Sequence, residues 1–307
     1  MNLNEEVRNG YTITAQMKKL WEKELLVFEK LYEVCNKYDL KVVATGGTCI
    51  GAVREHGFIP WDDDIDVEML RPDFEKLVSI AEKEFKYPFF LQCSRTEDNY
   101  PNGHAQLRLS GTTAILKGDY RKINHGIYVD IFILDAIPKD ENKLTQMQKK
   151  STLIKKRLNG YSYCTLPHLL GKNFLSLLFD YLYVKIKGYD RLNKEYEDIF
   201  RSNKIEDCEE VASMMFRWDQ IPRVRRSKHM MDKIILMPFE DILMPVPAMY
   251  DEILTNHFGD YMTPHKIPAF HDGYYMLDTN RDYSYYLPLM KRDLLKEKIH
   301  RLFHGGK

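Results

Sequence analysis

The chain has 307 residues, 44% of them hydrophobic, which is enough to bury one large core or two smaller ones. Its 45 basic residues balance its 45 acidic residues, and this excludes a global field that would recruit nucleic acid or an anionic membrane. The five scattered cysteines include no CxxC pair, so we expect reduced thiols rather than a zinc or dithiol centre.

Neither the N-terminus nor the most apolar stretch of the chain has the pattern of a membrane-inserted segment. Charges at residues 5, 6 and 8 interrupt the apolar run that a signal peptide would need. Residues 169–186 contain Lys172, Asp180 and Lys185, which are too many charges for a membrane span. We therefore expect a cytoplasmic protein.

The chain is predicted to open with a helix, a strand and a second, short helix. Apolar residues at helical spacing predict a long amphipathic helix from Thr14, its N-cap, to Cys35. Residues 41–45 predict a short strand, and the Gly-Gly-Thr at 46–48 is expected to break it before a helical segment over 49–56.

The elements that follow complete an α/β unit. Arg71-Pro72-Asp73 predicts the start of another helix, with proline in its first turn. Short strands are expected at 89–92, 105–109 and 126–134. Residues 1–140 therefore predict a mixed sheet with flanking helices, the α/β (α+β) class.

The rest of the chain is predicted as two further regions. Residues 141–236 begin as a lysine-rich helical insertion, and residues 237–307 form a tyrosine-rich segment expected to pack on the core. An apolar stripe in the insertion is expected to pack on the first unit, with an interfacial helix as the alternative. The stripe consists of Phe174, Leu177, Leu178, Tyr181 and Leu182.

Four carboxylates lie within five positions in GFIPWDDDIDV, residues 57–67. In a strand over residues 64–67, Asp64 and Asp66 project from one face, because side chains alternate. Crowded carboxylates raise each other's pKa unless a cation compensates them, and a divalent metal with oxygen ligands is the usual cation. The pair therefore predicts a metal site, whereas Asp62 and Asp63 are expected in turn or supporting roles.

A third acid lies in the strand GIYVDIFIL, residues 126–134, which is apolar on both faces except at Asp130. Such a strand is expected to be central and buried. An unpaired buried carboxylate costs several kcal/mol, so Asp130 is predicted to join Asp64 and Asp66 at the metal. The alternative is an acid that caps a neighbouring turn.

The Gly-Gly-Thr turn precedes the paired acids at a strand-to-helix junction, where backbone amides can hold phosphate oxygens. By itself it is also typical of an ordinary tight turn. The ordered set of strand, Gly-Gly-Thr, short helix, Asp-x-Asp strand and later aspartate strand resembles the nucleotidyltransferase fold. In that fold, paired acids and a third acid hold divalent metals against the phosphates of a nucleotide.

A longer string, GGTCIGAVREHGFIPWDDDIDVEMLRPDFEKL, is similar to the signature of the LicD family, the phosphorylcholine-transferase group to which the fukutin-related proteins are distantly similar. HGIYVDIFILDAIP and FGDYMTP agree with it. The resemblance implies transfer of a phosphoalcohol, phosphocholine first, from a CDP-linked donor such as CDP-choline. The acceptor would be a hydroxyl of a cell-surface glycan, such as teichoic acid or lipopolysaccharide, or of its lipid-linked precursor, with CMP released.

The resemblance also implies the roles of individual residues. The catalytic acids and ligands of Mg²⁺ or Mn²⁺ would be Asp64, Asp66 and Asp130, and Gly47 with Thr48 would form the phosphate-binding turn. Two arginines, Arg54 and Arg108, are candidates to clamp phosphate oxygens, although salt bridges with acids suit them equally well.

An aromatic lining is expected if the donor carries choline, since a quaternary ammonium is held through cation–π attraction. Trp61 is the first candidate, and the tyrosines Tyr274, Tyr275, Tyr283, Tyr285 and Tyr286 are others.

The chain also contains basic clusters at 149–157 and 223–228, and such clusters are most often solvated helix faces. The sharper hypothesis is that one of them docks an anionic polymer or a lipid-linked acceptor at the inner face of the membrane.

Three alternatives remain open from the sequence. A nucleotidyltransferase would use a nucleoside triphosphate and release pyrophosphate instead of CMP. Transfer of glycerol or ribitol phosphate would keep the chemistry and change the alcohol. A non-catalytic metal-binding scaffold would keep the acids for structure alone, and we place it last.

Overall fold

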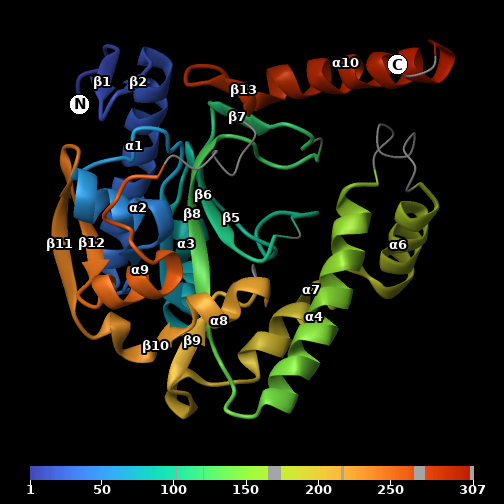
Figure 1. Cartoon of the computed structure of the whole chain (residues 1–307). Coiled ribbons are helices and arrows are strands. Elements are labelled where there is room, and N and C mark those ends of the chain that lie inside the picture. Colours follow the sequence, from blue (N-terminus) through green and yellow to red (C-terminus); the bar gives the residue numbers. More distant parts are fainter. Residues whose placement is uncertain (101, 120, 165–173, 216–217, 266–273, 305–307) are drawn as a thin grey trace.

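Helix α1 (Ala15–Lys37) begins where the sequence predicts it, because the Thr14 hydroxyl accepts a hydrogen bond from the backbone N–H of Met17 at 3.2 Å. The computed structural model describes the chain except residues 101, 120, 165–173, 216–217, 266–273 and 305–307 (Figure 1). The apolar side of α1, with Trp21, Phe28 and Leu31 at most 1% exposed, packs on the central sheet.

The central sheet is built around β8 (Ile127–Ala136). On one side β8 pairs in parallel with β4 (Asp66–Leu70), and β3 (Val43–Ala44) lies beyond β4. On the other side the first half of β8 pairs antiparallel with β6 (Ala105–Leu109), followed by β5 (Phe89–Gln92). Its last residues pair with β9 (Glu210–Ala212), followed by β10 (Arg226–Ser227). This seven-stranded sheet confirms the predicted mixed α/β fold.

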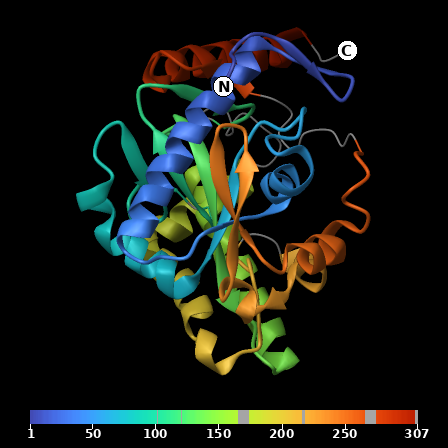
Figure 2. The ribbon, with the colours of Figure 1, turned by 90° about the vertical axis from the view of Figure 1, so that its left-hand side faces the viewer.

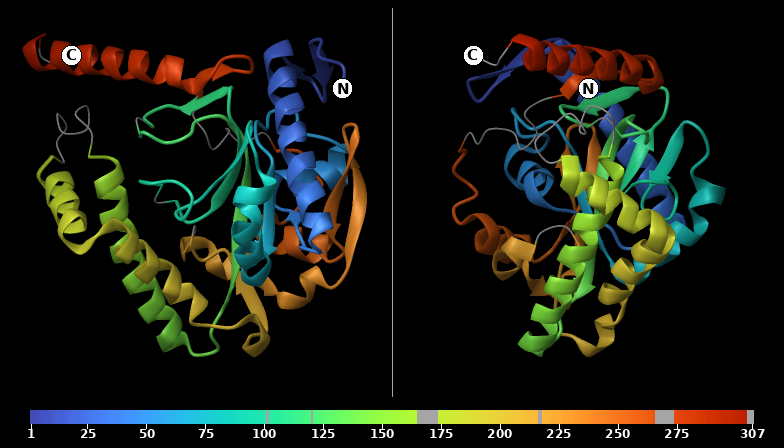
Figure 3. Two further views of the ribbon diagram at one scale, coloured as in Figure 1. Left: turned by 180° about the vertical axis from the view of Figure 1, so that it is seen from behind. Right: turned by 90° about the vertical axis from the view of Figure 1, so that its right-hand side faces the viewer.

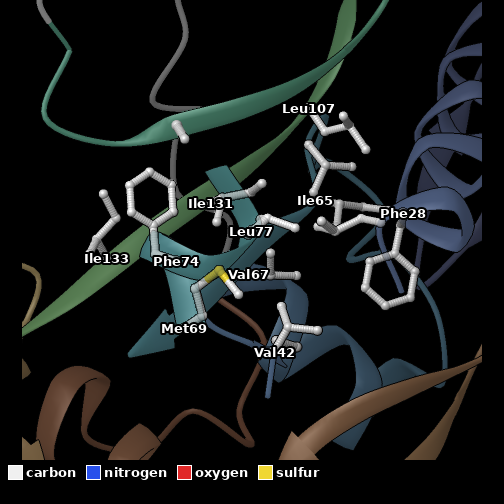
Figure 4. Packing of buried hydrophobic residues seen from close by; sticks show 14 of the residues in the cluster. Phe28, Val42, Ile65, Val67, Met69, Phe74, Leu77, Leu107, Ile131 and Ile133 are labelled. Atoms are coloured by element: carbon white, nitrogen blue, oxygen red, sulfur yellow. The ribbon is translucent and has the colours of Figure 1, made fainter. Parts of the chain in front are cut away.

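The two faces of β4 and β8 differ in chemistry. Val67 and Met69 of β4, with Ile131 and Ile133 of β8, pack against α1 and α3 (Arg71–Glu84), as Figure 4 shows. Asp66 and Asp130 project from the opposite face, because alternate residues of a strand point to opposite sides. Burying each large apolar side chain contributes about 1.5–3 kcal/mol, so the apolar face fixes the register that brings the two acids together.

The strand ends before Gly-Gly-Thr as predicted, but the predicted helix start at residue 49 is wrong. Helix α2 (Gly46–Ile50) begins at Gly46 itself and continues as one π-helical turn, Gly51–Glu55. Gly46 adopts φ +55°, which allows the chain to leave β3 and enter the helix without an intervening loop. The predicted strand at 64–67 is displaced in the same way, since β4 starts at Asp66 and Asp64 precedes it.

Several short strands were not predicted from the sequence. They are β1 (Glu6–Arg8), β2 (Tyr11–Ile13), β7 (Thr113–Leu116), β11 (Ile234–Phe239), β12 (Ile242–Pro247) and β13 (Tyr274–Asp278), besides β9 and β10. The β11–β12 hairpin contains three prolines, which weaken a strand signal and are tolerated in a two-stranded ribbon. Figure 2 shows this hairpin in front of the sheet with α1 beside it.

The helical insertion contains α4 (Glu141–Ser162), α6 (Phe174–Lys187) and α7 (Tyr189–Arg201), as predicted. Helix α6 packs on α4, where Arg157 pairs with Asp180, and it lies on the outer side of α4, away from the sheet (Figures 1 and 3). The predicted packing of its apolar stripe on the first unit is therefore wrong for Phe174 and Leu182, which are 41% and 50% exposed.

The remaining helices are α8 (Ile221–Val224), α9 (Tyr250–Phe258) and α10 (Tyr283–His304). Helix α10 packs Leu287 and Met290 on Ile115 of β7, and β7 also pairs with β13. Among the described residues, no helix has both the length and the apolar character that crossing a bilayer requires.

Candidate active site

The three acids singled out from the sequence lie together. Asp66 and Asp130 are directly paired across the parallel strands β4 and β8, and the Asp130 N–H donates to the Ile65 carbonyl at 2.9 Å. Asp64 precedes β4 by two residues and lies with them, so that one carboxylate oxygen from each acid falls within 4.8 Å of the others. Two segments separated by more than 60 residues thus form one acidic cluster.

The turn before β4 adds a second acidic group. One oxygen from each of Asp62, Asp63 and Asp64 also lies within 4.8 Å of the others, so Asp64 belongs to both groups. Neighbouring side chains hold this turn: Trp21 Nε1 donates to the Asp62 carbonyl at 3.0 Å, and the Tyr274 hydroxyl donates to the Asp63 carbonyl at 3.3 Å. The turn is therefore fixed by α1 and β13, elements from opposite ends of the chain.

Burial and mutual repulsion both act on the carboxylates of this cluster. Burial, reinforced by the charges of Asp64 and Asp130, raises the pKa of Asp66 well above its ordinary value. Glu24 of α1, 1% exposed, lies close enough to the same acids that burial and then their charges raise its pKa as well. An all-oxygen donor set of this kind suits a hard divalent cation such as Mg²⁺ or Mn²⁺.

Asp130 differs from Asp66 because it has donors around it. His104 Nε2 lies 3.1 Å from Asp130 Oδ1, and Gln106 Nε2 donates to the same oxygen at 2.7 Å. Burial alone would raise the pKa of Asp130, but the charge of His104 and these two hydrogen bonds outweigh it, so the pKa is lowered. The acid is thereby held as a carboxylate in one orientation.

Sequence reasoning missed His104 and Gln106. Both belong to the stretch HAQLRL, in which alternate residues of the strand share a face with Arg108. That alternation was a usable signal, because three polar side chains on one face of a strand flanked by apolar residues need buried partners. What the sequence could not supply was the pairing of Gln106 with Asp130 across β6 and β8.

The start of α2 abuts the acids. Thr48 Oγ1 accepts a hydrogen bond from the Asp66 N–H at 2.8 Å, which ties the helix to the first residue of β4. A Cβ added to Gly47 would lie 2.2 Å from Asp62 Oδ2, so only glycine allows this approach without moving the carboxylate. The phosphate-binding role of Gly47 and Thr48 remains a prediction, with both residues beside the acidic cluster.

The two predicted phosphate clamps are engaged with protein groups. Arg54 pairs with Glu55 at 2.7 Å and also donates to the Tyr261 carbonyl. Arg108 is 5% exposed and donates to the Gly126 carbonyl at 2.7 Å and to Gln106, which in turn donates to Asp130. Arg108 therefore reaches the acidic cluster through Gln106, and direct phosphate contact remains a prediction for both arginines.

The aromatic candidates are dispersed. Trp61 is half-buried next to the acidic turn, with its ring edge-on to Tyr11 at 6.0 Å, and Tyr274 contacts the same turn through its hydroxyl. Tyr283 and Tyr286 lie on α10 and are engaged elsewhere: Tyr283 lies against His125, and the Tyr286 hydroxyl donates to Asp278 of β13. Of the proposed aromatic lining, Trp61 and Tyr274 are the members that contact the turn or adjoin it.

Comparisons with known proteins agree with this geometry. Residues 39–167 match the family described as "LicD/FKTN/FKRP, nucleotidyltransferase domain", a range that contains α2, the acidic turn, β4 and β8. The "Lipopolysaccharide cholinephosphotransferase LicD" of Haemophilus influenzae is 27% identical over 265 residues, which cover 83% of this chain and 96% of that relative. The resemblance stated from the motifs is thus confirmed, since residues 39–167 match the nucleotidyltransferase domain of the LicD family.

Proposed function

We propose that this protein transfers a phosphoalcohol, with phosphocholine as the first candidate, from a CDP-linked donor to a hydroxyl of a cell-surface glycan or its lipid-linked precursor, releasing CMP. The observation that carries the proposal is the cluster of Asp64, Asp66 and Asp130, whose oxygens lie within 4.8 Å in a LicD-family domain. The relative named as a lipopolysaccharide cholinephosphotransferase supports the choice of alcohol and acceptor.

Asp64, Asp66 and Asp130 would hold Mg²⁺ or Mn²⁺. A bound divalent ion supplies positive charge against the phosphate oxygens, where negative charge builds during displacement at a diphosphate. Gln106 and His104 would keep the Asp130 carboxylate oriented, as either a metal ligand or the acceptor of the proton from the attacking hydroxyl. The N-terminal residues of α2, Gly47 and Thr48, would lie against the phosphates.

Choline recognition would use the aromatic side chains beside the acidic turn. A quaternary ammonium offers no hydrogen-bond donor and binds best over an aromatic face. Trp61 immediately precedes the acids, and Tyr274 contacts their turn, so both lie where the alcohol end of a donor could reach. Glycerol or ribitol would need polar partners there instead.

We also propose that residues 1–140 form the catalytic part, that 141–236 face the acceptor, and that 237–307 pack on the core. In this scheme the protein works in the cytoplasm, with peripheral contact at the inner face of the membrane. Support comes from the basic and apolar character of the insertion and from the contact of α10 and β13 with β7.

The test is a thermal-shift panel with Mg²⁺ or Mn²⁺ and CDP-choline, CDP-ethanolamine, CDP-glycerol, CDP-ribitol, CTP, ATP and UDP-glucose. A ligand at about 100 times its dissociation constant stabilises by about 2.7 kcal/mol. We expect a metal-dependent shift with one CDP-alcohol that Asp64→Asn abolishes and that the exposed control Asp207→Asn retains.

Other outcomes would redirect the proposal. Shifts with CTP or ATP, but with no CDP-alcohol, would favour a nucleotidyltransferase, and release of pyrophosphate in place of CMP would establish it. A silent panel, together with unchanged metal binding in Asp64→Asn, would overturn the transferase assignment.

A further inference from the structure

Helix α6 exposes a continuous apolar stripe. Leu175, Phe179, Leu182 and Ile186 recur at spacings of four, three and four residues, which places them along one side of the helix. Their side chains are 71%, 56%, 50% and 83% exposed. Large apolar side chains scattered singly on a surface are ordinary, but a contiguous stripe on one helix marks an interaction surface.

The charge of the segment that runs from α4 to the end of α6 is almost wholly positive. Residues 142–187 contain nine basic residues and one acid, Asp180, in a chain whose total charge is balanced. Asp180 is 2% exposed and paired with Arg157, so it offers no negative charge at the surface. Lys185 and Lys187 are exposed at the end of α6, as are Lys149, Lys150 and Lys156 on α4.

The described residues around α6 leave this stripe exposed. Helix α6 contacts α4 and α7 and lies at the outer edge of the molecule, on the side opposite the β11–β12 hairpin (Figures 1 and 3). Its inward side is occupied: Gly160 of α4 lies so close that an added Cβ would be 2.5 Å from the Asp180 Cβ. Rotating the helix to hide the stripe would therefore break a tight contact and the ion pair between Arg157 and Asp180.

The combination of an apolar stripe with flanking lysines selects one kind of partner. An amphipathic helix with a basic polar side is suited to lie in the surface of an anionic bilayer, with its apolar side in the acyl boundary and its lysines at the headgroups. A second copy of this chain would bring two strongly basic surfaces together, which like charges oppose. A nucleic acid would use the lysines but leave the apolar stripe in water.

We propose that α6, together with the exposed lysines of α4, docks this protein on an anionic lipid bilayer. The second basic cluster, at residues 223–228, is a poorer candidate because Arg225 pairs with Glu210 and Arg226 pairs with Glu68. Docking through α6 would bring a lipid-linked acceptor to the proposed transferase. The binding itself does not depend on that chemistry.

The experiment is co-sedimentation of the full chain with vesicles of phosphatidylcholine alone or mixed with phosphatidylglycerol. Wild type is expected to bind the anionic vesicles, with binding falling as salt rises. Leu175→Gln with Ile186→Gln should reduce the partition coefficient roughly tenfold or more, because both apolar anchors are lost. Lys185→Gln with Lys187→Gln should weaken binding to anionic vesicles by roughly fivefold per lysine.

The matched control is Leu236→Gln with Leu243→Gln, which removes two apolar side chains, 51% and 54% exposed, from the β11–β12 hairpin. It should bind as wild type does, and all variants should keep the wild-type unfolding temperature, since exposed side chains contribute little to the core. Asp64→Asn should also bind normally, so that a failed transferase proposal and a failed docking proposal give different results.

Three outcomes would overturn docking through α6. The first is that wild type stays in the supernatant when anionic vesicles are sedimented at low salt. The second is that Leu236→Gln with Leu243→Gln reduces vesicle binding as much as Leu175→Gln with Ile186→Gln does. Finally, sedimentation equilibrium could reveal a dimer that Leu175→Gln with Ile186→Gln dissociates while vesicle binding is unchanged, which would assign the stripe to a second copy.

Discussion

Asp66→Asn tests whether the acidic cluster is arranged for a cation rather than for stability. Two unit charges 4.8 Å apart, the limit for the oxygens of this cluster, repel by about 3 kcal/mol at an effective dielectric constant of about 20. Burial, together with the charges of Asp64 and Asp130, raises the pKa of Asp66, so holding this carboxylate charged costs the fold free energy. Without metal, the substitution should therefore stabilise the fold by about 1–3 kcal/mol, or roughly 2–6 °C for a chain of this size.

The pH dependence of this gain has a defined sign. A carboxyl whose pKa is raised in the folded state destabilises the fold as pH rises above its unfolded value, because the unfolded chain releases the proton first. The gain from Asp66→Asn should thus be largest at pH 8 and vanish near pH 4. It is measured by thermal unfolding in EDTA and again in MnCl₂, where wild type should gain stability and the variant should gain little.

Asp135→Asn is the contrasting control on the same sheet. Asp135 of β8 is fully buried and paired with Arg71 through two contacts of 2.7 Å, Nε to Oδ1 and Nη2 to Oδ2. Removing one partner of such a pair costs about 3–5 kcal/mol, and the loss should be the same with and without metal. If Asp66→Asn instead lowers the unfolding temperature in EDTA and retains the full MnCl₂ shift, the reasoning about the acidic cluster is refuted.

Two further predictions concern neighbouring groups. Gly47→Ala should change the unfolding temperature of the free protein by only a few degrees. It should weaken the metal-dependent thermal shift caused by the donor, because the new Cβ displaces the Asp62 carboxylate. An unchanged thermal shift with the donor would contradict this reasoning. Burial lowers the pKa of His125 from 6.5 to about 4, so stability should fall as pH drops below 6.5, by up to about 2 kcal/mol at pH 5. Urea unfolding of His125→Asn at pH 5 and 7.5 should lack that loss, and an equal loss in the variant would assign it elsewhere.

Local signals predicted several elements of the fold and the candidate acids. The N-cap at Thr14 and the helical spacing after it predicted α1, and the boundaries of β5 and β6 matched the predicted strands. One charged residue in an otherwise apolar strand predicted that Asp130 is buried and central, and alternation predicted that Asp64 and Asp66 lie on one side. Each of these signals depends only on backbone period and on the cost of burying charge, both of which a short segment contains.

The errors and omissions share a different cause. The strands β9, β10 and β13 are two to five residues long and exist through partners far away in the chain. The start of helix α2 is held by a hydrogen bond from the backbone N–H of Asp66, in β4, to the hydroxyl of Thr48. The local pattern around the glycines gives no sign of this contact between distant segments. Pairing between distant segments is decided by which packing of the whole chain buries the most apolar surface.

By itself, the sequence determined the acids, the family resemblance and the helical, basic nature of the insertion. The tertiary structure alone decided that Gln106 and His104 hold Asp130, that Glu24 lies near the acids of the turn, and that the stripe of α6 faces outward. The reason is physical: periodicity specifies which residues share a face of one element, but the contacts made by that face depend on the element that packs against it.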